Sequence, residues 1–240
     1  MPLESRFART KLPGNQLLAQ LPADVGDRLR PHLRSVRLKR GESIFRAHEP
    51  LHTAYFPVTG VISLLTRLTD GKTLELGLVG KDGMAGVALL PGVNTMPFDG
   101  TVQVAGTALR LTAEALKQMV REPGPIHELL GRYAYSVFAL GVQTAACNNF
   151  HSLKKRTARW LLMLHDLAEN AEFPLTQNTL ALMLGVRRPS VTIAARALQR
   201  AGLVDYRHGR MRIRNRRGLE AASCECYRVI RQEQQRLLGY

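Results

Sequence analysis

A predicted helix near residues 188–200 carries the side chains whose chemistry is easiest to interpret. Its outward positions combine guanidinium groups and hydroxyls with one apolar side chain: Arg187, Arg188, Ser190, Thr192, Ile193 and Arg196. Guanidinium and hydroxyl groups donate hydrogen bonds to base edges and to phosphate oxygens. The pattern therefore predicts a helix that contacts duplex DNA, and the alternative is an exposed basic helix in an ordinary two-helix corner.

The residues before this helix supply the turn that would present it. Thr176 can cap a short helix whose Leu180 faces inward, and Gly185 can end it in the left-handed conformation of a tight turn. Ala181 is small enough to permit a close helix crossing. The spacing predicts a helix-turn-helix, with Thr176 and Gln177 as further DNA contacts at the start of its first helix.

Two short strands are predicted between residues 203 and 214, joined by a turn at His208-Gly209. This arrangement is a wing, and the residues that it places at its tip for phosphate contact are Arg207, His208 and Arg210. Upstream, Lys154 and Lys155 lie at the start of an amphipathic helix, where lysines oppose the macrodipole. A DNA phosphate backbone would favour them there, and a solvated surface is the alternative.

Charge supports a polyanionic partner. The 240 residues contain 34 Lys and Arg against 19 Asp and Glu, for a net charge of +15. Residues 1–150 hold 17 basic and 12 acidic residues, whereas residues 151–240 hold 17 and 7, so the shorter part carries most of the excess. Nucleic acid or an anionic membrane surface fits this asymmetry, and a merely solvated basic face is the alternative. The uncharged stretch 133–150 is too polar for lipid, so we expect no membrane partner.

The N-terminal half has the texture of an antiparallel roll. A short helix over 21–33 precedes β-rich runs at 36–39, 43–45, 54–57, 61–66, 73–79, 101–105 and 108–111. Glycines at Arg40-Gly41-Glu42, Thr59-Gly60 and Asp70-Gly71 are predicted to reverse the chain between strands. A helix over 113–120 then ends at a Pro-Gly-Pro break.

A much longer helix begins at Ile126, and its apolar surface is wider than packing on one sheet requires. The residues that recur every three or four positions are Ile126, Leu130, Tyr133, Val137, Leu140 and Thr144. A self-association seam along this line is one outlet for the apolar surface, and burial inside one subunit is the other.

Cysteine usage indicates a reducing cytoplasm. Cys147, Cys224 and Cys226 are too few for a disulfide framework, and residues 1–146 contain none. Cys224-x-Cys226 with Cys147 far upstream is too sparse for a structural zinc site, so packing or surface thiols are expected. The histidines show only a loose His48-x-x-x-His52 spacing, and we expect no metal and no cofactor.

The chain resembles the Crp/Fnr family of bacterial transcription regulators over nearly its whole length. The resemblance rests on the helix-turn-helix and wing over 175–213, on the roll motifs at 38–45 and 55–62, and on the long helix from Ile126. It implies an α+β fold with a cyclic-nucleotide-binding-like antiparallel β-roll, or jelly-roll (1–122), a dimerisation helix with a hinge near 148–152 (123–151) and a winged helix-turn-helix (152–240).

Departures from the family pattern are informative. Members that bind cyclic AMP carry a Gly-Glu-Leu turn followed by an arginine pair for the phosphate, whereas this chain has Gly80-Lys81-Asp82-Gly83 and no arginine between Arg67 and Arg110. Without a guanidinium partner we expect no tight cyclic-nucleotide binding, with Lys72 or Lys81 as weaker substitutes. The missing N-terminal cysteines exclude an iron-sulfur cluster of the Fnr type. On the recognition helix, Arg188 keeps the family's first arginine as the expected guanine contact, while Pro189 and Ile193 replace its Glu and second Arg.

The resemblance implies a regulator, not an enzyme, that binds a near-palindromic site on double-stranded DNA as a homodimer. RNA polymerase is a further candidate partner, and the effector is either a small molecule of a kind that the sequence does not specify or none, with control by amount or by a protein partner. The competing interpretation is a cupin-like metal-binding or enzymatic roll with an appended basic domain. Such a roll needs clustered histidines on facing strands, and strands 36–111 lack them.

Overall fold

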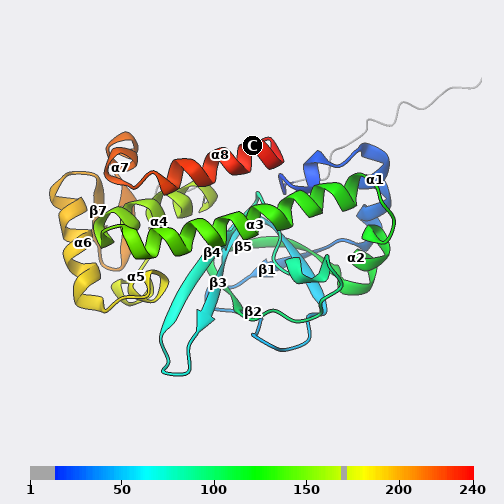
Figure 1. Ribbon diagram of the computed structural model, residues 1–240, viewed down its shortest axis with the longest axis horizontal. Coiled ribbons are helices and arrows are strands. Elements are labelled where there is room, and N and C mark those ends of the chain that lie inside the picture. Colours follow the sequence, from blue (N-terminus) through cyan, green and yellow to red (C-terminus); the bar gives the residue numbers. More distant parts are fainter. Residues whose placement is uncertain (1–13, 169–171) are drawn as a thin grey trace, which may run out of the picture.

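The computed structural model describes residues 14–168 and 172–240. An antiparallel sheet dominates the N-terminal half and helices dominate the C-terminal half (Figure 1). The sheet contains β1 (Arg34–Leu38), β2 (Ser43–Phe45), β3 (Thr53–Arg67), β4 (Thr73–Val79) and β5 (Asp99–Thr112). Its order is β1-β5-β3-β4, with β2 also paired to β5. The predicted antiparallel roll is confirmed.

Several predicted strands are in fact continuous. The runs at 54–57 and 61–66 merge into β3, and those at 101–105 and 108–111 merge into β5. The predicted reversal at Gly60 is therefore wrong: its φ is +83°, the register against β5 shifts around it, and an added Cβ would lie 2.7 Å from the Val104 carbonyl oxygen. Glycine here permits a bulge that bends one strand. The reversal at Asp70-Gly71 is confirmed, since it joins β3 to β4 with Gly71 at φ +82°.

Short helices flank the roll: η1 (Leu18–Gln20), α1 (Ala23–Leu29), η2 (Arg30–His32), η3 (Val87–Leu89) and α2 (Ala113–Val120). The predicted helix at 113–120 has the expected bounds because the Thr112 side chain caps it, accepting from the Ala115 N–H at 3.2 Å. Buried side chains of the roll, including Phe56, Ile62 and Leu111, pack with these helices into one core.

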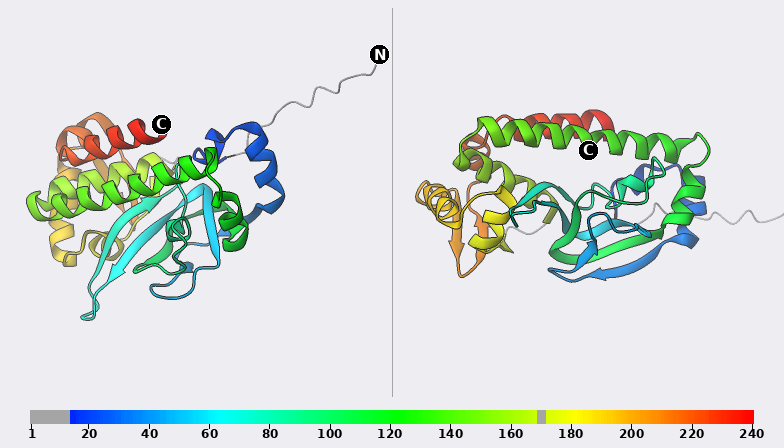
Figure 2. Two further views of the ribbon diagram at one scale, coloured as in Figure 1. Left: turned by 45° about the vertical axis from the view of Figure 1, so that its right-hand side comes forward. Right: turned by 60° about the horizontal axis from the view of Figure 1, so that its bottom comes forward.

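Helix α3 (Pro125–Phe150) runs the length of the molecule, and α8 (Cys226–Leu238) lies along it (Figures 1 and 2). The chain thus returns from the C-terminal half to the roll, where Leu238 is buried in the roll's core. The Arg132 Nε donates to the Leu237 carbonyl at 3.1 Å, and the Tyr240 hydroxyl donates to the Asp82 carbonyl. The last helix therefore ties the two halves together.

The C-terminal half contains α4 (Leu153–Ala168), β6 (Glu172–Pro174), α5 (Gln177–Leu184), α6 (Arg188–Arg200), β7 (Val204–Arg207), β8 (Arg210–Ile213) and α7 (Arg216–Ala222). Its three strands pair in the order β6-β8-β7. Its core, built around Leu161 and Phe173, also takes in Val61 and Leu78 from the roll, so the halves dock through apolar contact. Among the described residues, no helix combines the length and apolar character needed to cross a membrane.

Candidate nucleic-acid interface

The helix-turn-helix forms as the sequence predicts. The Thr176 Oγ1 caps α5 by accepting from the Thr179 N–H at 3.1 Å, and Gly185 ends α5 at φ +63°. Val191 and Leu198 of α6 are fully buried, and they pack α6 into the core that contains α5. These local signals determine how α6 is presented, so its opposite side remains in solvent.

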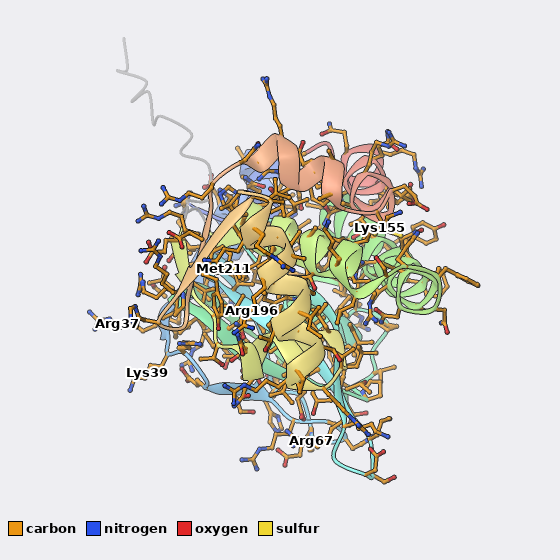
Figure 3. All side chains as sticks on the ribbon, turned by 90° about the vertical axis from the view of Figure 1, so that its left-hand side faces the viewer. Arg37, Lys39, Arg67, Lys155, Arg196 and Met211 are labelled. Atoms are coloured by element: carbon orange, nitrogen blue, oxygen red, sulfur yellow. The ribbon has the colours of Figure 1, made fainter. Side chains whose placement is uncertain are left out.

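The outward side of α6 is basic and open. Arg187, Arg188, Ser190 and Arg196 are exposed, and Ile193 has 68% of its surface accessible. Figure 3 looks onto this side and shows Arg196 on it. Among residues 14–168 and 172–240, no carboxylate forms an ion pair with an arginine of α6. These guanidinium groups are therefore available to a polyanion.

Two predicted DNA contacts lie deeper than the rest. The Thr192 hydroxyl is part-buried and sits 2.8 Å from the Gln177 Oε1 and 3.1 Å from the Arg188 carbonyl oxygen. Thr192 and Gln177 thus hold the start of α5 against α6. This contact positions α6.

The wing forms where it is predicted, with one feature that sequence reasoning missed. His208 and Gly209 have φ of +49° and +72°, the pattern of a two-residue hairpin turn between β7 and β8. The arginines of the wing are paired with acids: Arg207 and Arg214 with Asp205, and Arg210 and Arg212 with Glu172. These pairs neutralise much of the wing's charge. The Glu172 carboxylate comes from β6, a strand that the sequence did not predict.

The basic start of α4 divides into two groups. Lys154 and Lys155 are exposed. Figure 3 shows Lys155 to one side of α6, beside α4 and the end of α3. Arg156 turns inward and its Nη2 donates to the Leu184 carbonyl at 2.6 Å, so it caps the end of α5. Only the two lysines remain candidates for phosphate contact.

Most of the line of residues predicted as a self-association seam packs inside the chain's own fold. Four of its residues are buried within the chain's own fold: Ile126, Leu130, Tyr133 and Thr144. Val137 packs against the roll's core, and Leu140 contacts Gly77. On this side of α3 the structure agrees with the alternative interpretation, burial inside one subunit. The sheet and α8 both pack on the helix, so one side of α3 is occupied.

A different apolar stripe on α3 is open. It consists of Tyr135, Phe138 and Val142, whose exposed fractions are 52%, 66% and 56%, followed by Ala145. Their spacing of three and four residues is that of a coiled-coil seam. The sequence shows these residues as part of the wide apolar surface of the helix but does not single them out as the seam, because apolar residues occur on both sides of α3 and only the packed fold distinguishes them.

Neighbouring side chains contact the segment Gly80–Gly83, the stretch that the family resemblance equates with a cyclic-phosphate turn. The Tyr133 hydroxyl of α3 donates to the Met84 carbonyl at 2.9 Å and lies 2.5 Å from where a Cβ on Gly83 would sit. The Asn15 Nδ2 donates to the Gly83 carbonyl at 3.0 Å. Lys72, proposed as a substitute anchor, pairs with Asp70 at 2.6 Å at the exposed tip of the β3–β4 hairpin. The segment itself therefore receives no help from Lys72.

The three cysteines do not behave as unrelated packing thiols. Cys147, Cys224 and Cys226 form a buried cluster of their own, joined by His151. The sequence signal that could have found the cluster is Cys147-x-x-x-His151 at a helix end together with Cys224-x-Cys226, but Cys147 and Cys224 are 77 positions apart in the chain.

Two family models match the chain. The Crp-like helix-turn-helix domain matches residues 155–222, and the cyclic nucleotide-binding domain matches residues 35–122. Together they span more than half of the chain. None of the curated proteins gives a sequence match.

Several solved structures share the fold. FixK2 from Bradyrhizobium japonicum is 17% identical with a TM-score of 0.68, covering 80% of this chain and 98% of its own. The c-di-GMP-responsive regulator CLP from Xanthomonas campestris is 20% identical with a TM-score of 0.66, covering 80% and 99%. A CRP/FNR-family transcriptional regulator from Thermus thermophilus is 22% identical with a TM-score of 0.64, covering 79% and 98%. The likeness extends over both halves of the molecule.

Proposed function

Since the chain belongs to the Crp/Fnr family of transcription regulators, we propose that it binds a near-palindromic operator as a homodimer. It is a DNA-binding regulator and not an enzyme. The observation that carries the proposal is the outward side of α6, where exposed arginines have no acidic partner among the described residues. The proposed activity belongs in the compartment that holds the DNA, the cytoplasm expected from the cysteine content.

On the operator, α6 lies in the major groove. Arg188, in its first turn, donates to guanine, and Arg196, two turns further on, contacts a phosphate. Ile193 lies between them and offers an apolar surface to a thymine methyl group. Ser190 contacts a base or a phosphate. Because Pro189 takes the place of the family's glutamate, the preferred operator differs from that of the cyclic-AMP receptor protein.

The wing and α4 supply weaker contacts. Lys154 and Lys155 reach the phosphate backbone from the side of α4, and His208 approaches it from the tip of the wing. Arg207 and Arg210 contribute less than their charge suggests because Asp205 and Glu172 pair with them. Contacts of this kind add affinity for every sequence equally.

The second copy docks on the open stripe of α3. Exposed aromatic and branched side chains at coiled-coil spacing are uncommon on a solitary helix, and a paired α3 would bury Tyr135, Phe138 and Val142. Such a pair places two copies of α6 one duplex turn apart, at about 34 Å.

Charge on the stripe tests the dimer. Phe138→Asp should give monomers by light scattering and abolish operator binding, because a carboxylate cannot enter an apolar seam. Leu68→Asp also introduces an aspartate, at a residue that is 55% exposed on the β3–β4 hairpin, and it should leave the mass unchanged. A Phe138→Asp protein with the mass of the unaltered chain would place the interface elsewhere.

The absent arginine and the Tyr133 contact argue against a cyclic nucleotide as effector. Control therefore comes from another small molecule, or from protein amount or a protein partner without any ligand, and RNA polymerase is a further candidate partner. In every case the break between α3 and α4 at His151 is the hinge through which the halves would reorient.

The operator is found by selecting bound duplexes from a random pool with the purified full-length chain. A two-fold symmetric site with half-sites about 10 base pairs apart is the expected result. Recovery of unrelated sequences without symmetry would contradict the proposal.

A further inference from the structure

Three thiols and one imidazole meet at the hinge between α3 and α4. Cys147 lies in the last turn of α3, His151 follows that helix, and Cys224 and Cys226 lie at the start of α8. The Sγ atoms of Cys147 and Cys224 are 3.4 Å apart, and the Cys226 Sγ is 3.5 Å from the His151 Nδ1. All four ligand atoms lie within 4.8 Å of one another. We propose that this cluster binds one zinc ion with Cys₃His ligation.

The separations suit a single tetrahedral ion. With a zinc–sulfur bond of about 2.3 Å, two thiolates on one zinc ion lie about 3.8 Å apart. The observed contacts of 3.4 and 3.5 Å and the limit of 4.8 Å bracket this value, so small side-chain movements close the site. An iron-sulfur cluster shares its ligands among several iron atoms and requires a wider ring of cysteines.

The side chains around the ligands are arranged as they are in zinc sites. The Glu225 Oε1 lies 3.1 Å from the His151 Nε2, which leaves Nδ1 to face the sulfur atoms. A carboxylate that accepts from the far nitrogen of a histidine fixes its tautomer and orients the ring toward a metal. The Gln143 Nε2 donates to the Cys226 Sγ at 3.0 Å, a bond that suits a thiolate.

A buried positive charge beside the cluster also favours a bound metal thiolate. Arg159 is only 4% exposed, and its positive charge acts on Cys147. Within the described residues no carboxylate forms an ion pair with Arg159, its Nη1 donates only to the Thr144 Oγ1 at 3.3 Å, and its Nε has no hydrogen-bond partner. The Glu75 carboxyl interacts electrostatically with Arg159, but burial raises the pKa of that carboxyl to about 8, so at neutral pH it supplies little negative charge. A buried cation without a full counter-charge is costly. Three thiolates on Zn²⁺ carry a net charge of −1, which offsets this cation, whereas three neutral thiols do not.

The ligands are largely shielded from solvent but reachable. The three cysteines are buried, His151 is partly buried, and an open groove that reaches Cys224 runs past Glu225 and Arg228. A bound ion would join the end of α3 and the hinge to α8, which continues to the roll. A bound ion would therefore hold the hinge in place, and its ligands lie outside the predicted DNA contacts.

Metal analysis of the untagged full-length chain, purified with reductant, tests the proposal. We expect one zinc ion per chain after dialysis. After removal of the ion by a chelator, added Co²⁺ should release thiol protons and give the intense visible and thiolate-to-metal charge-transfer bands of a tetrahedral thiolate site. Added Zn²⁺ should then displace Co²⁺ and abolish these bands.

Variants separate ligands from neighbours. Cys147→Ser and His151→Ala should lower zinc affinity at least about 100-fold, and Glu225→Gln about 10-fold or more because it only orients His151. His127→Ala, at the other end of α3, is the matched control and should bind zinc like the unaltered chain. The cobalt spectrum of the unaltered chain remains decisive if a variant fails to fold.

Three results would overturn the proposal: a reduced chain that takes up no zinc, a cobalt spectrum of an octahedral, sulfur-free site, or undiminished zinc binding by Cys147→Ser. A Cys147–Cys224 disulfide in the isolated chain overturns it as well if zinc uptake does not follow reduction. Because these measurements involve no DNA, failure of the operator proposal would leave the zinc result standing.

Discussion

The DNA-binding end and the roll differ in how they treat their polar groups. On α6, Arg188 and Arg196 stand in solvent without acidic partners among the described residues. At the roll, two polar groups are turned inward and hydrogen-bonded: Glu75 is only 5% exposed and accepts from Trp160, and the Tyr133 hydroxyl donates to Met84. The exposed arginines are available to a polyanion, whereas the hydrogen bonds of Glu75 and Tyr133 are already made within the chain.

The largest expected effect lies where the two ends meet. Glu75 of β4 accepts from the Trp160 Nε1 at 2.6 Å and from Ser63 at 2.8 Å, and burial raises its pKa to about 8. Between the ordinary pKa of 4.5 and 8, the folded chain keeps a proton that the unfolded chain has released. The free energy of unfolding should therefore fall as pH rises through this window, by at most about 1.4 kcal/mol per pH unit.

Denaturant titrations from pH 5 to 8 measure this slope. Glu75→Gln keeps a hydrogen-bond acceptor but cannot titrate, so its free energy of unfolding should vary less with pH than that of the unaltered chain. Identical slopes for both proteins would show that the junction does not hold a protonated carboxyl group.

The next effect concerns the open end. Arg188→Ala should cost about 1–3 kcal/mol on the selected operator and relax one base position, because a bidentate contact to guanine is lost. Arg217→Ala, which removes an exposed arginine from α7, is the control and should change operator affinity little. Binding measured by anisotropy decides between them. An equal loss for Arg188→Ala on operator and scrambled DNA would mean that this residue contacts only phosphate.

A smaller effect distinguishes the wing from α6. Glu172 accepts from both Arg210 and Arg212, and these arginines lower its pKa. Glu172→Gln should free two cations, raise affinity for all sequences a few-fold and steepen the dependence on salt by about one to two counterions. Glu233→Gln removes the same charge from α8 and should have no such effect. An equal gain in affinity for both variants would show that the effect comes from net charge alone.

The smallest expected effect is at the closed end. Cyclic AMP should not shift the thermal midpoint of unfolding, since a ligand that does not bind the folded state cannot stabilise it. A rise of the midpoint with cyclic AMP concentration would show that the segment at Gly80–Gly83 opens and that the contrast between the two ends is wrong.

Local signals explain what the sequence predicted well. Thr176, Gly185 and the apolar spacing between them determine α5 and its turn within a few residues, so the outward side of α6 follows directly. The bounds of α2 follow in the same way from its Thr112 cap. The roll was recognisable from its strands, although Gly60 marks a bulge rather than a turn.

The missed features depend on contacts between distant residues. Glu172 neutralises arginines 38 and 40 positions away, and no local pattern announces such a pairing. Cys147 meets Cys224 only because α8 folds back along α3. The apolar residues around Phe138 were visible in the sequence but could not be told apart from those on the other apolar side of α3, and only docking on the roll shows which side remains open.

The most direct test of specific recognition is a salt titration of the unaltered chain on the selected operator and on a scrambled duplex of equal length. We predict that both affinities fall as salt rises, while the operator stays tighter by about 1,000-fold or more, because base contacts persist when phosphate contacts are screened. Equal affinities that vanish together would contradict the account and reduce α6 to a non-specific basic surface.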